Sequence, residues 1–275
     1  MIQKVTILNT TTKKPITLIG ERAGVCWGAD ITNEEKNFKR GLDCLKKNHG
    51  RVLEFVNVEM VLDKYSARVI REWYTHLGGS PTRLQASTRY INYEDFDYII
   101  PVTVQRTEAA MKLYVKTMEM IAENCHKLET EMNIPREDSA MLLPLGMTTK
   151  IVDKRNLRNL IDMSHQRMCT RAFWEFRELF GEVAASLAEL DPEWRYIVEN
   201  YFVPKCAITK GGCPEGKNCF LGKHYENRQT YSLDELLKDK GVQKYEAEEL
   251  TDDDINSLVD MACEFDRDDS EHFEG

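Results

Sequence analysis

The sequence predicts an α+β fold, in which long amphipathic helices pack on a central, mainly antiparallel sheet. Residues 56–63 alternate apolar and polar side chains, as a strand with one buried face does. Apolar residues recur about every 3.6 residues from Thr107 to Met132, and again from Phe173 to Leu190, which is typical of helices that bury one side. A chain of 275 residues is long enough to bury a sizeable core.

In the N-terminal half, the sequence predicts short strands between helices. Asn33 precedes Glu34 and Glu35 as a helix N-cap does, and this helix is expected to end near Lys47. The other elements expected here are a strand at 5–8, a run at 22–27 that leads into a loop, a strand at 56–63, a helix at 67–76, a loop at 77–90 and a strand at 98–100.

The C-terminal half is predicted to be mostly helical. Pro135 fits the start of a short helix, because proline is tolerated at the first helical position. Asn156 is expected to begin a helix directly after a strand at 150–153, and Asp191 to cap another that follows it. We predict that the methionines of the helix at 107–132 fill the core.

Composition divides the chain into a main domain at 1–203, a cysteine-rich loop at 204–224 and an acidic tail at 225–275, partly helical or mobile. The chain has a net charge of −9, but residues 246–275 hold thirteen acidic residues and one arginine, which leaves the remainder at +3. Such a body suits a small anionic ligand such as a nucleotide. Its charge is too weak to predict binding to duplex nucleic acid.

The sequence also bears on compartment. It has no run of eighteen apolar residues, and its first residues become polar too quickly for a signal peptide. Its eight cysteines are scattered, which fits reduced thiols better than a disulfide framework. We therefore expect a cytoplasmic protein that does not bind membranes.

The stretch from Glu72 to Tyr90 is unusually polar and is the first candidate site. Gly78 and Gly79 would let backbone N–H groups approach an anion, and Arg83 and Arg89 add positive charge. A nucleotide-phosphate site is one interpretation of this stretch. A solvated joint between a helix and a loop is the other.

The same stretch resembles the signature of the flavin-dependent thymidylate synthases, which is arginine–histidine–arginine, a seven-residue spacer, and then serine followed closely by arginine and tyrosine. His76 and the run Ser87-Thr88-Arg89-Tyr90 match this signature. Thr75 and Leu77 stand where the family has arginines, and the spacer 78–86 is two residues longer. The chain therefore resembles a divergent member of this family.

Further segments extend the resemblance over most of residues 2–202. They are His49–Phe55, Arg71–Tyr74, Met141–Leu145, Asn156–Arg158 and Ala172–Glu175. Two more departures stand out. Ala140 occupies the place of a phosphate-binding arginine, and Arg171 that of a histidine.

The resemblance implies FAD-dependent methylation of dUMP to dTMP, with methylenetetrahydrofolate and NADPH as co-substrates, by a homotetramer whose sites form between subunits. Residues 1–203 would be the nucleotide- and flavin-binding domain. Because of the departures, one-carbon transfer to another pyrimidine deoxynucleotide, or nucleotide binding without catalysis, are alternatives.

The resemblance also implies roles for individual residues. Arg167 would polarise the pyrimidine ring, and Ser87 is the other candidate catalytic residue, although no general base for it is visible. The nucleotide-binding residues would be Glu72, Gln85, Ser87, Thr88, Arg89 and Arg167. The flavin-binding residues would be Cys26, Glu54, His76, Asn156, Arg158 and Asp162. Cys26 could equally be a small buried cysteine, and Glu54 a solvent-facing residue.

Three cysteines and a histidine follow the main domain. Cys206, Cys213, Cys219 and His224 could bind zinc, but their spacings are wide and there is no Cys-x-x-Cys knuckle. The sequence favours free or redox-labile thiols over a zinc site.

Overall fold

The computed structural model describes residues 4–92, 95–209, 213, 219, 225 and 228–242. Its centre is an antiparallel sheet with the strand order β1-β2-β4-β3. The strands are β1 (Val5–Ile7), β2 (Asn57–Ser66), β3 (Thr82–Gln85) and β4 (Thr148–Asn156). In β2, Val58, Met60 and Leu62 are fully buried, so the alternation in the sequence correctly predicts the buried face.

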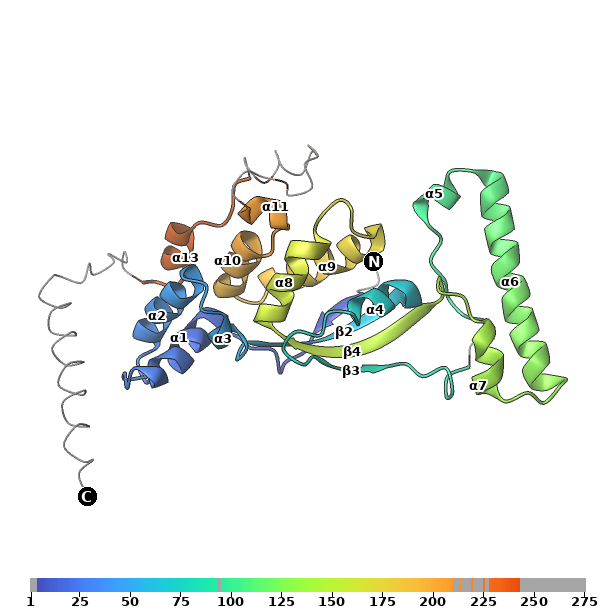
Figure 1. Cartoon of the computed structure of the whole chain (residues 1–275), viewed down its shortest axis with the longest axis horizontal. Helices are drawn as coiled ribbons and strands as arrows, with labels where there is room; N and C mark the ends of the chain where they lie inside the picture. Colours follow the sequence, from blue (N-terminus) through green and yellow to red (C-terminus); the bar gives the residue numbers. More distant parts are fainter. Residues whose placement is uncertain are drawn as a thin grey trace, which may run out of the picture.

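Helices cover one face of the sheet and one of its ends (Figure 1). Over the face lie α4 (Ala67–Trp73), α8 (Leu157–Arg167), α9 (Trp174–Ala188) and α10 (Pro192–Tyr201). At the end lie α1 (Pro15–Cys26), α2 (Glu34–Lys46) and α3 (Gly50–Leu53). The helix α13 (Leu233–Asp239) lies next to α2. One continuous apolar core joins these helices to the sheet, and Trp73 and Trp194 are fully buried in it.

The predicted helix caps are confirmed. The side-chain oxygens of Asn33, Asn156 and Asp191 each accept a backbone N–H in the first turn of α2, α8 and α10, respectively. Residues 233–239 of the tail are helical and form α13, where Ser232 and Glu235 form a capping box and Leu236 is buried. Residues 243–275, which hold most of the acidic tail, lie outside the described residues.

The sequence did not predict a helix before the loop that follows Trp27, but residues 22–26 form the end of α1 and a turn comes next. The glycines of α1 and α2 explain this helix. A Cβ on Gly20 would lie 1.8 Å from the carbonyl oxygen of Asn37, and one on Gly41 would lie 1.9 Å from that of Ile16. The two helices therefore touch backbone to backbone, which makes glycines that lower helix propensity necessary for packing.

Two predictions near the sheet edge also need correction. The loop expected at 77–90 contains the edge strand β3, which pairs with β4. The strand expected at 98–100 is reduced to one bridge between Tyr98 and Met147. In both places, whether a strand forms depends on backbone pairing with β4 or with the residue just before it. The local sequence pattern does not reveal that partner.

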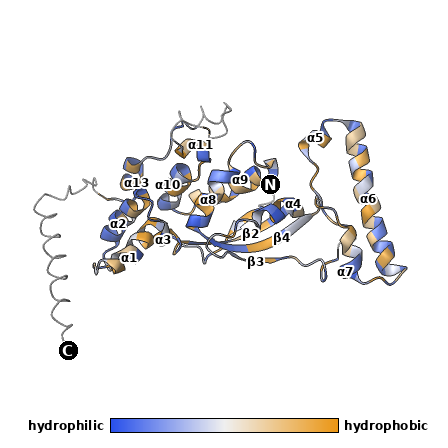
Figure 2. Ribbon diagram, in the orientation of Figure 1, coloured by the Kyte–Doolittle hydropathy of each residue, from blue (hydrophilic) through white to orange (hydrophobic). Residues whose placement is uncertain are grey.

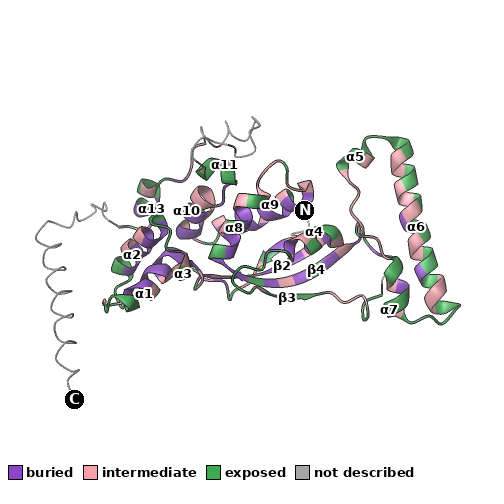
Figure 3. Ribbon diagram, in the orientation of Figure 1, coloured by how far each residue is buried: buried purple, intermediate pink, exposed green. Residues whose placement is uncertain are grey.

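An arm extends from the other end of the sheet (Figure 1). It contains α5 (Val102–Gln105), α6 (Glu108–Thr130), α7 (Arg136–Ser139) and the 3₁₀ turn η1 (Ala140–Leu142). The predicted long helix is confirmed as α6, but only Met118 and Cys125 of it are buried. Met120 is 52% exposed, so the expectation that its methionines fill the core is correct only for Met118. Figure 3 shows this contrast between the buried body and the exposed arm.

The arm nevertheless carries apolar residues along its length (Figure 2). Its small core is formed by Phe96, Met118 and Met147. No helix among the described residues is both long and apolar enough to cross a membrane.

Candidate active site

Arg167 ends α8 and lies against the C-terminal side of α4. Its Nε donates a hydrogen bond to Nε2 of His76 at 2.9 Å, and a terminal nitrogen pairs with Glu72 at 3.1 Å. Its guanidinium also stacks on the ring of Phe176, 4.8 Å from the ring centre. The fold thus gathers Glu72, His76 and Arg167, which the sequence analysis placed in the site from two separate segments.

His76 is almost fully buried beneath this arginine. Burial first, and then the positive charges of Arg167 and Arg155, lower the pKa of His76 to about 4. The imidazole is therefore neutral near pH 7. Because its Nε2 accepts the bond from Arg167, its proton is on Nδ1.

A buried ion pair lies beneath the site. Arg155 and Asp153, both on β4, form a two-bond pair with distances of 2.5 and 3.0 Å, and their side chains are fully buried. Arg155 also donates to Asn159 of α8 at 2.6 Å and stacks on Trp73 at 4.5 Å. These contacts fix α4 and α8 to the sheet, and hence the positions of Glu72 and Arg167.

A second group surrounds the start of α8. The amide nitrogen of Asn156 lies 3.5 Å from the carbonyl oxygen of Gly79, which has a positive φ of 72°. A Cβ on Gly79 would lie 2.0 Å from that nitrogen, so only glycine fits here. Nearby in sequence, Arg158 donates to Glu54 at 2.7 Å. Of the predicted flavin residues, Asn156 therefore contacts the loop that holds His76, and Arg158 pairs with Glu54.

The predicted nucleotide residues at the end of β3 lie elsewhere. The hydroxyl of Ser87 accepts the N–H of Arg89 at 3.2 Å, and Gln85 donates to Thr149 of β4. Arg89 pairs with Glu137 of α7 at 3.1 Å. In Figure 1, β3 runs toward α7 and away from α8. Within one chain, the structure thus does not bring Ser87 and Arg89 together with Arg167.

Arg136 is a candidate that the sequence analysis did not single out. One terminal nitrogen of its guanidinium lies 3.4 Å from the carbonyl oxygen of Tyr90, and its Nε pairs with Glu129. It lines a small cavity with Thr88 and Ala140. An arginine in the first turn of a short helix resembles an ordinary surface residue in sequence, so only the fold reveals its proximity to the turn at Ser87.

Two predicted flavin residues do not join these groups. Cys26 lies at the exposed end of α1, so the alternative of a buried cysteine is wrong. Asp162 is exposed on α8. Glu54, which the sequence left open, is one-third exposed and paired with Arg158.

A cavity of about 420 Å³ opens beside Arg167. Four cysteines line it, namely Cys169, Cys206, Cys213 and Cys219, together with His165, Arg171 and Lys205. Burial chiefly, and then its neighbours Cys213, Cys219 and Cys169, raise the pKa of the Cys206 thiol. The sequence did not predict that Cys169 would lie with Cys206, Cys213 and Cys219. His224 belongs to the predicted zinc group but lies outside the described residues.

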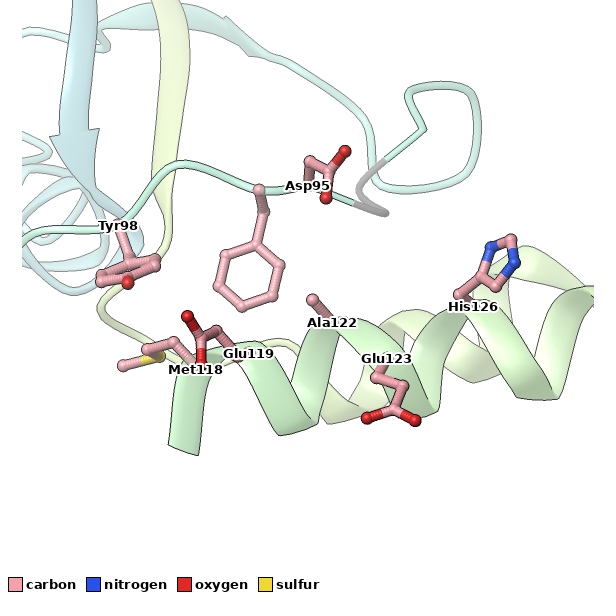
Figure 4. Close-up of a pocket in the computed structure, with 8 residues that line it drawn as sticks. Asp95, Tyr98, Met118, Glu119, Ala122, Glu123 and His126 are labelled. Carbon is pink, nitrogen blue, oxygen red and sulfur yellow. The ribbon is translucent and has the colours of Figure 1, made fainter. Parts of the chain in front are cut away.

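Another cavity, of about 530 Å³, lies between the arm and the sheet (Figure 4). Tyr98 and Met118 lie at one end of it and His126 at the other. Asp95, Glu119 and Glu123 also line it. These carboxylates would repel a phosphate, so the Arg167 side is the better candidate for an anionic nucleotide.

Known proteins resemble this chain in sequence. The profile of the Thy1 family, described as thymidylate synthase complementing protein, matches residues 7–193. The flavin-dependent thymidylate synthase of Clostridium tetani is 26% identical over 244 residues, which cover 80% of this chain and 94% of that protein. That of Thermococcus onnurineus is 29% identical over 231 residues, covering 78% and 90% of the two chains.

The fold has solved counterparts. The crystal structure of the flavin-dependent thymidylate synthase from Helicobacter pylori, complexed with FAD and dUMP, matches with a TM-score of 0.57 and 17% identity. The match covers 72% of this chain and 99% of that one. Because the family profile spans well over half of the sequence and the fold agrees, this chain belongs to the Thy1 family of thymidylate synthase complementing proteins.

Proposed function

We propose that this protein methylates dUMP to dTMP as a flavin-dependent thymidylate synthase, with methylenetetrahydrofolate as the one-carbon donor and NADPH as the reductant. The convergence of Glu72, His76 and Arg167 supports this proposal. These contacts hold the guanidinium of Arg167, the residue to which the resemblance assigns the pyrimidine ring, in one position. A preorganised positive charge stabilises negative charge that develops on a ring as it reacts.

The residues around Gly79 fit FAD as the cofactor. Arg158 is half exposed, so its guanidinium can reach phosphate oxygens. Asn156 is buried against Gly79, so it would position the loop around Gly79 for the cofactor. With Glu54 and His76, these residues would hold FAD, which supplies the hydride chemistry when bound, while the protein supplies position and charge. Cys26 and Asp162 are not part of this proposed set, because within the described residues neither bonds to Glu54, Asn156 or Arg158.

The phosphate of the nucleotide is proposed to bind at the turn after β3. Ser87, Thr88 and Arg89 form this turn, and Gln85 precedes it. Arg136 lies beside the turn and lines the same small cavity as Ala140, the position where the family has a phosphate-binding arginine. We propose that Arg136 supplies the charge that is lost at Ala140. Ser87 then binds the nucleotide and is not a nucleophile.

Residues from separate subunits are proposed to complete each site in a homotetramer. Two observations support this. Ser87 and Arg89 lie by α7, whereas Arg167 lies by α4, so a single chain holds the two halves apart. The arm also exposes apolar side chains that a partner would bury, including Leu113, Met120, Met132, Met141 and Leu145.

The test is dTMP formation by the purified protein, followed by mass spectrometry. We expect dTMP only when FAD, NADPH, methylenetetrahydrofolate and dUMP are all present, and NADPH oxidation that rises on adding dUMP. Absence of both would contradict the proposal. The same assay with dCMP separates the alternatives: a methylated or hydroxymethylated dCMP would indicate another substrate, and dUMP binding without any product would indicate a non-catalytic relative.

A further inference from the structure

The four cysteines beside Arg167 come together from distant parts of the sequence. Cys169 follows the end of α8, Cys206 lies in α11 (Lys205–Ile208), and Cys213 and Cys219 follow it. All four are half-buried and line one cavity. The other described cysteines lie apart from it: Cys44 and Cys125 are buried in α2 and α6, and Cys26 is exposed at the end of α1.

Specific contacts place Cys206 next to Cys169. The hydroxyl of Ser164 and the Nδ1 of His165, both near the end of α8, bind the carbonyl oxygen of Val203 at 3.4 and 2.8 Å. These bonds lay the start of the cysteine-rich segment along α8. Cys169 is therefore a neighbour of this segment through the fold, although 37 positions separate it from Cys206 in the sequence.

The far end of the same segment returns to α10. Asn200 donates to the carbonyl oxygen of Tyr231 at 3.0 Å, and the N–H of Tyr231 donates to Glu199 at 2.7 Å. The two ends of the cysteine-rich segment, at Val203 and Tyr231, are thus both fixed to the body of the protein. The segment is rich in glycine and lysine, so it has few apolar side chains with which to offset the entropy lost when it is ordered.

We propose that Cys169, Cys206, Cys213 and Cys219 bind one zinc ion that ties the cysteine-rich segment to the end of α8. Four thiolates are a complete tetrahedral set for structural zinc, and such an ion contributes directly to folding. The described residues contain no group of three or more Cys, His, Asp or Glu side chains already arranged to hold a metal. Binding therefore draws the four sulfurs from the cavity wall to about 2.3 Å from a common centre and releases four thiol protons to solvent.

The surroundings suit the charge of such a site. A zinc ion with four thiolates carries two net negative charges, and Arg167, Arg171 and Lys205 line the same cavity. The zinc site would then form part of the wall of the cavity that Arg167 also lines. The metal site does not rest on the proposed enzyme activity, because zinc content reports it directly.

The first experiment measures zinc in the full-length protein, produced with added zinc and freed of any affinity tag. Elemental analysis should find close to one zinc ion per chain. We expect Cys169→Ser and Cys206→Ser to retain zinc at least about tenfold more weakly against a competing chelator. The matched control, Cys26→Ser, removes a cysteine outside the cavity and should retain zinc as the wild type does.

A second measurement avoids variants that fail to fold. A mercurial reagent that titrates thiols should release the zinc of the wild-type protein, and cobalt exchanged into it should show intense sulfur-to-metal absorption bands. Wild-type protein without zinc would overturn the proposal, as would iron with inorganic sulfide in its place, or disulfides among these cysteines. Zinc lost in His224→Ala but kept in Cys169→Ser would overturn this set of ligands.

Discussion

Nε of Arg167 donates a hydrogen bond of 2.9 Å to Nε2 of His76, and the same guanidinium pairs with Glu72. The neutral imidazole acts as an acceptor, so it orients the arginine without repelling it. The side chain is therefore fixed before any nucleotide arrives, and less conformational entropy is lost on binding. This relationship links the loop after α4 to the end of α8.

Binding of dUMP should require the branched guanidinium of Arg167, and not only its positive charge. A lysine cannot bond His76 and Glu72 together, so Arg167→Lys should lower dUMP affinity by at least about tenfold in isothermal titration. Arg195 is a matched control, because it also pairs with a carboxylate and stacks on a ring, those of Glu199 and Tyr231. Arg195→Lys should bind dUMP as the wild type does. Equal affinities in both variants would refute the role of Arg167.

Binding of the dUMP phosphate should depend on Arg136. We expect Arg136→Gln to weaken dUMP binding by about tenfold and to leave binding of deoxyuridine, which has no phosphate, unchanged. Because Arg136 also pairs with Glu129, thermal unfolding of the variant must be measured alongside. An equal loss of affinity for both ligands would show that the variant disturbs the turn at Ser87 and that Arg136 does not contact the phosphate.

His76 should make the protein less stable in mild acid. Its pKa is about 4 when folded and 6.5 in the reference state, so above pH 6.5 both the folded and the unfolded states are neutral. As the pH falls from 6.5 toward 4, the unfolded state binds a proton that folded His76 does not. From pH 7 to pH 5 this contribution costs about 2 kcal/mol of the free energy of unfolding.

Urea unfolding of the wild type and His76→Gln at both pH values tests this. All other titrating groups are shared, so the difference between the two proteins isolates His76. The variant should lose about 2 kcal/mol less than the wild type on acidification. Identical losses would mean that His76 titrates normally.

Gly79 should be irreplaceable for a reason beyond backbone conformation. In Gly79→Ala the new Cβ meets the amide of Asn156, which cannot retreat freely because its side chain caps α8. We expect a loss of roughly 2–3 kcal/mol in stability and weaker FAD binding. Gly28 also has a positive φ, but a Cβ there would meet open space. Gly28→Ala should therefore cost only about 1 kcal/mol and leave FAD affinity unchanged.

The exposed arm should mediate assembly. Leu113 and Met120 are seven residues apart on α6, so they share a face that points away from Met118 and Cys125. Met120→Glu should shift the protein from tetramer toward smaller species in light scattering, because a charge would be buried at the interface. Lys112→Glu, an exposed change on the same helix, should leave the mass unchanged. A tetramer that survives Met120→Glu would place the interface elsewhere.

The sequence by itself determined the features whose signals are local. Asn33, Asn156 and Asp191 cap helices because a short side chain bonds the backbone two or three residues ahead, and that needs no distant partner. The buried face of β2 and the extent of α6 follow from periodicity alone. The resemblance also marked Glu72, His76 and Arg167 as candidate site residues, but it did not predict their contacts with one another.

Only the tertiary structure decided the features that depend on distant neighbours. The glycines of α1 and α2 let the two helices pack backbone to backbone, and β3 is a strand because it pairs with β4. The fold also decides three long-range neighbours. It places Arg89 beside α7, Arg136 beside the turn at Ser87, and Cys169 in the same cavity as Cys206. Such contacts join residues far apart in the sequence, and spacing along one chain carries no signal of them.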